Sequence, residues 1–190
     1  MANKDAAFGL RPIGKGGQNR DNQGLSEYSI AASASAIYQN DPVQALATGT
    51  IGVASTSTAV LLGSLNGVFY TDSSTKKPTW ANHLEASNAA TDIVGFVSDD
   101  PYERFEVQSN GTNAITQASV FFNYNISYVA GDSANYLSKV ELDESTGVST
   151  TAQLRLIGFS NDPDNNDISS ANVNMVVMIN EHFLKSTTGI

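Results

Sequence analysis

The densest group of acidic side chains lies near the C-terminus, where Asp162, Asp164 and Asp167 alternate with proline and asparagine. Hard oxygen ligands at alternating positions are typical of calcium sites. However, Asp167 stands where the calcium loop of an EF-hand needs glycine, and Val173 stands where it needs a bidentate glutamate. We therefore interpret the segment first as a polar turn, and we keep the three aspartates as a candidate calcium site.

The sequence offers little for covalent or acid–base catalysis. His83 and His182 have no second histidine or carboxylate cluster at ligand spacing, so both are interpreted as ordinary surface or core residues. Glu103 and Glu106 are the pair considered for glycoside hydrolysis, but on a strand residues three apart face opposite sides. The segment Gly14-Lys15-Gly16-Gly17 lacks the Ser or Thr that follows the lysine of a phosphate-binding loop. We expect no enzymatic activity, no metal and no cofactor.

The composition argues against several partners. The chain has 190 residues, 15% of them charged, and a net charge of −9. Binding to a nucleic-acid backbone or an anionic membrane needs clustered Lys and Arg, whereas the longest basic run is Lys76-Lys77. The absence of cysteine excludes disulfides, cysteine-ligated zinc and thiol catalysis. With no signal-peptide pattern and no apolar stretch of about 18 residues, we expect synthesis in a cytoplasm.

Short segments of alternating or continuous apolar residues follow one another from residue 25 onward. An alternation with a period of two places successive side chains on opposite faces of a strand. Frequent Asn-Gly and Asp-Pro turns between short strands are typical of sandwiches and barrels. Only Trp80 and Leu84, four residues apart, indicate one or two helical turns within residues 79–87. The sequence therefore predicts an all-β protein with little helix, in which residues 25–190 form a single compact β-barrel or β-sandwich domain.

The first 24 residues have the composition of an extended N-terminal arm. Five glycines and Pro12 interrupt them, and Phe8, Leu10 and Ile13 are their main apolar side chains. One alternative is a free disordered tail. The other is an arm that orders against a neighbouring subunit and inserts Phe8 and Leu10 there, because such a segment cannot bury a core alone.

The opening run Ala2-Asn3-Lys4-Asp5-Ala6-Ala7-Phe8-Gly9-Leu10-Arg11-Pro12-Ile13-Gly14 resembles the start of small head proteins of marine tailed phages, the decoration or cement proteins. One departure is Asn40, which stands where that family's turn typically has glycine. Further similar stretches are Asn40–Val43, Gly67–Phe69, Pro78–Trp80, Asp100-Pro101, Phe105–Gln108 and Val177–His182.

This resemblance implies a subunit on the capsid exterior of a virion, with the major capsid protein as its partner. It also implies a homo-oligomer, with a trimer favoured and a dimer possible. Members of the family lock neighbouring capsomers and stabilise the mature head, and the resemblance supplies no catalytic residues. In this hypothesis the capsid-binding arm comprises Phe8, Leu10, Arg11, Pro12 and Ile13.

A second hypothesis is another virion surface protein, such as a head fibre or tail component, with a glycan-binding role. Trp80, Tyr70 and Tyr102 are the aromatic side chains that could stack on sugars if they are exposed. A third hypothesis, an enzyme that uses Glu103 and Glu106, is the least favoured.

Overall fold

The computed structural model describes residues 2–16, 24–111, 115–187 and 189. Within these residues the chain forms twelve strands and two single-turn 3-10 helices. They are β1 (Arg11–Lys15), β2 (Ser26–Ser29), β3 (Pro42–Ala45), β4 (Ile51–Val53), β5 (Gly63–Thr71), β6 (Pro78–Ala81), β7 (Val94–Ser98), β8 (Glu103–Gln108), η1 (Gln117–Ser119), β9 (Asn123–Ser127), β10 (Glu141–Val148), β11 (Leu154–Phe159), β12 (Asn174–Ile179) and η2 (Phe183–Lys185).

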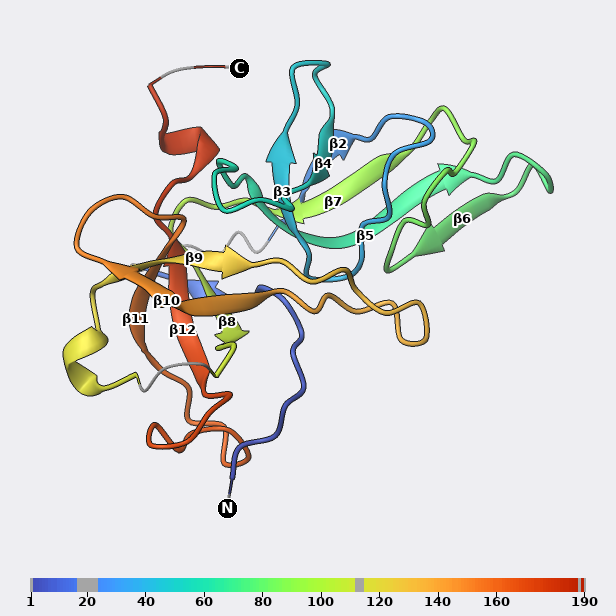
Figure 1. Cartoon of the computed structure of the whole chain (residues 1–190). Coiled ribbons are helices and arrows are strands. Elements are labelled where there is room, and N and C mark those ends of the chain that lie inside the picture. Colours follow the sequence, from blue (N-terminus) through green and yellow to red (C-terminus); the bar gives the residue numbers. More distant parts are fainter. Residues whose placement is uncertain (1, 17–23, 112–114, 188, 190) are drawn as a thin grey trace.

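The strands form two antiparallel sheets of six strands each, drawn in Figure 1 with one sheet above the other. The lower sheet, sheet A, has the order β1-β8-β12-β11-β9-β10. In the upper sheet, sheet B, the order is β2-β7-β5-β3-β4, and β6 pairs with β5. The chain begins in sheet A, builds all of sheet B from β2 to β7, and then returns to complete sheet A.

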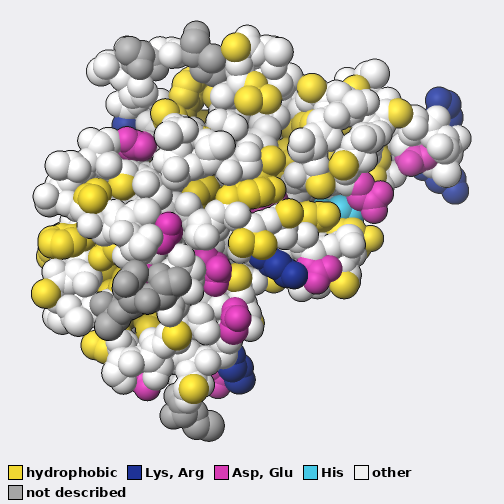
Figure 2. All heavy atoms as spheres, viewed as in Figure 1, with side chains coloured by type: hydrophobic (Ala, Val, Ile, Leu, Met, Phe, Trp, Pro, Cys, Tyr) yellow, Lys and Arg dark blue, Asp and Glu magenta, His cyan; other side chains and the backbone are white. Residues whose placement is uncertain are grey.

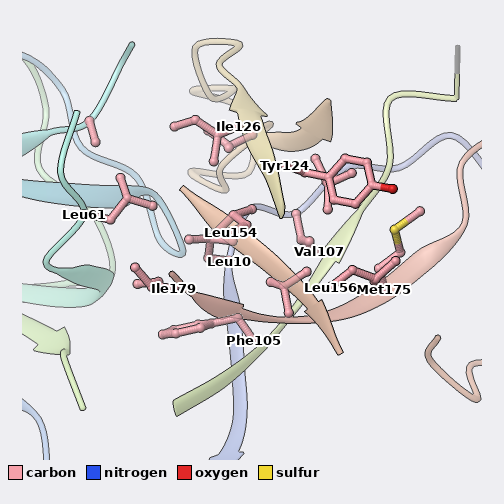
Figure 3. Packing of buried hydrophobic residues seen from close by; sticks show 14 of the residues in the cluster. Leu10, Leu61, Phe105, Val107, Tyr124, Ile126, Leu154, Leu156, Met175 and Ile179 are labelled. Carbon is pink, nitrogen blue, oxygen red and sulfur yellow. The ribbon is translucent and has the colours of Figure 1, made fainter. Parts of the chain in front are cut away.

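Each sheet has its own hydrophobic cluster. Phe105, Leu154 and Leu156 belong to the cluster of sheet A (Figure 3), whereas Leu65, Val68 and Val97 belong to that of sheet B. The prediction of an all-β fold with little helix is confirmed. Of the two predicted architectures, two separate sheets are observed, and the pairing of the described strands does not close a barrel.

The predicted boundary between an arm at 1–24 and a body at 25–190 does not match the sheets. Residues 11–15 form β1, an edge strand of sheet A that pairs with β8. Leu10 is fully buried in the cluster of sheet A, where Figure 3 shows it beside Leu154. The part of the arm that the structure describes is thus packed on its own chain, because an apolar side chain and an open strand edge were available there. Residues 17–23 of the predicted arm lie outside the described residues.

A close crossing fixes this N-terminal segment to the turn before β3. Gly9 adopts a φ of +75°, and a Cβ at this position would lie 2.4 Å from the carbonyl oxygen of Asn40. The Leu10 N–H donates to that same carbonyl oxygen at 2.9 Å, and the Asn40 side chain donates to the Phe8 carbonyl at 3.1 Å. Asn40 itself has a φ of 67°. Asparagine tolerates this left-handed conformation better than most other residues.

The helical turn considered for residues 79–87 is wrong. Residues 78–81 form β6, which pairs with β5 so that Trp80 lies opposite Phe69. Leu84 forms an isolated bridge with Ile37 and is fully buried. The four-residue spacing of Trp80 and Leu84 was therefore accidental, because one side chain faces solvent and the other the core.

No helix among the described residues is long and apolar enough to span a membrane.

Candidate interaction surfaces

The predicted arm residues occupy three different environments. Leu10 is buried, whereas Ile13 is 49% exposed because β1 has an irregular register between Pro12 and Gly14. Pro12 lies opposite Phe105 in the strand pair. The guanidinium of Arg11 lies 4.5 Å from the centroid of the Phe8 ring and also forms an ion pair with Glu106. Of the five predicted arm residues, Ile13 and Arg11 are the ones exposed to solvent.

The three candidate calcium ligands each bind a different part of the chain. Asp162 accepts hydrogen bonds from the Asp164 N–H and the Asn174 side chain. Asp164 pairs with Lys4 at 2.5 Å, and Asp167 accepts from the hydroxyls of two serines that follow it. Among the described residues no group of three or more acidic, histidine or cysteine side chains is close enough to hold a metal ion. The structure therefore does not assemble the calcium site.

Glu103 and Glu106 serve the pairing of β8 with β1. Glu103 accepts a hydrogen bond from the Gly14 N–H at 3.0 Å. Burial raises the pKa of Glu103, and the Gly14 N–H and the Lys15 charge oppose that rise. Glu106 accepts from the Arg11 guanidinium. The two carboxylates are thus held by different residues of the edge strand.

The two histidines belong to packed environments. The His83 ring stacks on Tyr136 with the ring centroids 3.6 Å apart. His182 is buried, and its Nδ1 accepts a hydrogen bond from the Leu184 N–H at 3.1 Å. Burial, helped by the charge of Lys185, lowers the pKa of His182 to about 4. Both positions agree with the interpretation as surface or core residues.

The most exposed large apolar side chain among the described residues is Phe121, at 72%. It follows η1 and is next to Phe122, which is 42% exposed. We call this adjacent pair the Phe121–Phe122 knob. The preceding residue, Val120, packs against the cluster of sheet A. Both knob residues are tied to the middle of β11, because the Phe121 N–H donates to the Leu156 carbonyl at 2.9 Å and the Leu156 N–H donates to the Phe122 carbonyl at 3.0 Å.

The backbone of the knob is strained. Phe121 has a φ of 76°. A bulky side chain in the left-handed region costs about 1–3 kcal/mol, and such residues persist only where the surroundings impose them. Here the ring projects into solvent, so the isolated chain gains little from it.

The run Val120-Phe121-Phe122-Asn123-Tyr124 has the β-branched and aromatic composition of a single strand, and this hides the knob in the sequence. The structure begins β9 only at Asn123. Adjacent residues of a strand point to opposite faces of the sheet, so Phe121 and Phe122 could not both point to the same face. That conflict was a signal that at least one of them points outward, although it could not identify which one.

Of the three aromatic residues considered for sugar stacking, Trp80 is 67% exposed and Tyr102 is 47% exposed. Tyr70 is half-buried and packs against the cluster of sheet B. Trp80 and Tyr102 therefore remain candidates for contact with a ligand or partner. Figure 2 shows one face of the molecule, on which apolar patches lie among uncharged polar atoms and charged side chains are sparse.

Comparisons with protein families, with curated proteins and with solved structures found no match to this chain. The exposed aromatic side chains described above are therefore the candidate interaction surfaces.

Proposed function

We propose that this chain is a non-enzymatic decoration protein of a tailed-phage head. It binds the outer surface of the major capsid protein lattice and stabilises the mature head. The observation that carries this proposal is the Phe121–Phe122 knob, an exposed aromatic pair on a strained but firmly hydrogen-bonded loop. The resemblance of residues 2–14 to head decoration proteins supports the same function.

The knob suits adhesion to a rigid partner. Fully burying a Phe side chain contributes roughly 1.5–3 kcal/mol, which is of the same order as the strain of its backbone. A pocket on the capsid that accepts Phe121 would thus recover the cost of presenting it. The backbone hydrogen bonds to Leu156 hold the loop in place beforehand, so little loop entropy is lost on binding.

A modest affinity per subunit is sufficient on a shell. A ligand that binds the mature lattice better than the immature one shifts the equilibrium towards maturity in proportion to that difference. Oligomerisation of the decoration protein multiplies the contacts without improving any one of them. We propose a homo-oligomer, with a trimer favoured over a dimer, located on the capsid exterior of the virion after synthesis in the host cytoplasm.

Removing residues 1–24 is a poor test of capsid binding, because Leu10 and β1 belong to the fold. Single substitutions on the surface avoid this difficulty. We would measure co-sedimentation of the purified chain with mature heads assembled from the major capsid protein of the phage that encodes it. The variant is Phe121→Asn, and the matched control is Val129→Asn, which removes another apolar side chain that is 47% exposed.

The wild-type chain is expected to saturate mature heads and to raise their melting temperature. Phe121→Asn should weaken binding by about tenfold or more, because about 1.5–3 kcal/mol of burial is lost. Val129→Asn should change binding by less than about threefold. The proposal fails if the wild-type chain does not bind the heads, if it binds only their interior, or if both substitutions have the same effect.

A further inference from the structure

The outward face of sheet B carries a second aromatic surface, on the hairpin of β5 and β6 that extends to the right in Figure 1. Val68 and Ala81 point to the cluster of sheet B. By alternation, Phe69 and Trp80 point to the opposite face. Trp80 stacks on Phe96 of β7 with ring centroids 4.8 Å apart and an interplanar angle of 26°. The Phe69 ring tilts against Trp80 at 5.0 Å.

This three-ring stack holds Trp80 in one orientation and still leaves it 67% exposed. Among the described residues, no hydrogen bond engages the indole N–H. The rings beneath it fix the indole plane before any ligand arrives. A fixed, exposed indole is suited to bind a flat apolar surface and to donate one hydrogen bond at its edge.

A groove of about 550 Å³ lies beside Trp80. That volume falls within the range of roughly 300–1,000 Å³ usual for small-molecule sites. Its lining contains aromatic, aliphatic and amide side chains and no charged one. The lining residues are Leu25, Asn66, Gly67, Trp80, Ala81, Asn82 and Phe96.

The side-chain amides that line the groove belong to Asn66 and Asn82, and they are positioned in different ways. The register between β5 and β7 is irregular from Leu65 to Gly67, and the inserted residue is Asn66. Such an irregularity re-aims a side chain, and here it leaves the Asn66 amide exposed and without a hydrogen bond among the described residues. Asn82, by contrast, is oriented by neighbours. It donates to the Gln39 side chain at 3.3 Å, and its oxygen lies 2.9 Å from His83 Nδ1.

Gly67 provides the floor between these groups. A Cβ there would lie 3.0 Å from the Ala81 carbonyl oxygen, so the close approach of β5 to β6 is tighter than most side chains tolerate. The absence of a side chain also keeps the space beside Trp80 open.

From this geometry we propose that the Trp80 groove binds a neutral carbohydrate. A pyranose ring has an apolar face that covers an indole and a rim of hydroxyls that exchange hydrogen bonds with amides. The uncharged lining favours a neutral ligand. A nucleic acid is disfavoured, because its phosphates require positive charge that the lining lacks. The proposal is independent of capsid binding, since the knob lies after η1 beside sheet A and the groove lies on sheet B.

The test uses the single tryptophan of the chain, which is Trp80. Selectively excited tryptophan fluorescence and the indole N–H signal in NMR spectra therefore report on this site alone. The probes are cellohexaose, maltohexaose, mannohexaose and chitohexaose, each titrated to about 10 mM. The hexanucleotide dT6 and an uncharged Gly/Ser peptide serve as competing ligand classes.

At least one neutral hexasaccharide is expected to shift both Trp80 signals in a saturable manner, and dT6 and the peptide are expected to shift neither. By calorimetry, Trp80→Ala should weaken that binding by about tenfold or more and Asn66→Ala by about threefold or more. Phe121→Asn should leave it unchanged. Trp80 is largely exposed, so the melting temperature of Trp80→Ala should stay within a few degrees of the wild-type value. The proposal is overturned if no hexasaccharide shifts the signals, if dT6 or the peptide binds instead, or if binding survives Trp80→Ala.

Discussion

The N-terminal segment and the Phe121–Phe122 knob differ in the burial of their apolar side chains and in the residue that adopts a positive φ. In the N-terminal segment, Leu10 is fully buried, and the glycine before it adopts the positive φ that the close crossing requires. In the knob, Phe121 is 72% exposed, and the aromatic residue itself adopts the positive φ. The first arrangement stabilises the fold, whereas the second weakens it.

This difference separates residues that serve the chain from residues available to a partner. A backbone conformation that costs energy is expected where burial offsets it or where function maintains it. Leu10 and Gly9 meet the first condition within the chain. Phe121 does not, so we expect its burial to come from another molecule.

The largest expected effect is at Leu10. Leu10→Ala should lower the free energy of unfolding by about 2–5 kcal/mol, because it removes a buried side chain and leaves a cavity in the cluster of sheet A. Ile13→Ala, three residues away and 49% exposed, should change it by less than about 0.5 kcal/mol. Urea unfolding followed by circular dichroism measures both. Equal small effects would mean that the N-terminal segment does not belong to the fold of the free chain.

The strand segments could be predicted because their alternation is local. Phe105, Val107, Leu154 and Leu156 are buried, and in the sequence they alternate with polar residues. The location of Leu10 could not be predicted in the same way. Its environment depends on β8 and on the turn at Asn40, which are distant in sequence. The sequence showed Leu10 as an apolar residue in a glycine-rich segment, but it could not show whether Leu10 packs on the same chain or on another.

The candidate sites also depend on contacts between residues that are distant in sequence. The alternating aspartates at 162–167 satisfied a spacing rule, yet each finds a separate hydrogen-bond partner in the folded chain. To predict the groove at Trp80, one would need to know which residues of different strands come together. Asn66, Trp80 and Phe96 come from three different strands, and a strand irregularity aims one of them. No linear spacing encodes that arrangement.

A second prediction concerns the turn that holds the N-terminal segment. Asp41 is fully buried, and burial raises its pKa to about 6, although the Tyr38 N–H that it accepts at 2.8 Å opposes the rise. Between pH about 4 and about 6 the folded chain therefore keeps a proton that the unfolded chain loses. Consequently, the contribution of Asp41 to the free energy of unfolding falls as the pH rises through this window and is constant above it. A shift of this size corresponds to about 2–3 kcal/mol.

Asp41→Asn isolates this contribution, because other groups titrate in the same range. Burial raises the pKa of Glu141 to about 7, with help from the charge of Asp5, so Glu141 acts in the same direction. The low pKa of His182 acts in the opposite direction. We therefore expect the stability of Asp41→Asn relative to wild type to rise by about 2 kcal/mol between pH 4 and pH 7. Chemical unfolding at several pH values measures this difference, and a difference independent of pH would contradict the prediction.

The smallest expected effect on the free energy of unfolding is at Phe121 of the knob. Phe121→Asn should leave the free energy of unfolding unchanged or raise it by up to about 1 kcal/mol, because asparagine accepts a positive φ more readily than phenylalanine and little buried apolar surface is lost. Val129→Asn is the matched control, since it also removes an exposed apolar side chain but no strained residue. A clear loss of stability in Phe121→Asn alone would show that the ring contributes to the fold of the free chain. In that case Phe121 would serve the fold as Leu10 does, and it would not be presented for a partner.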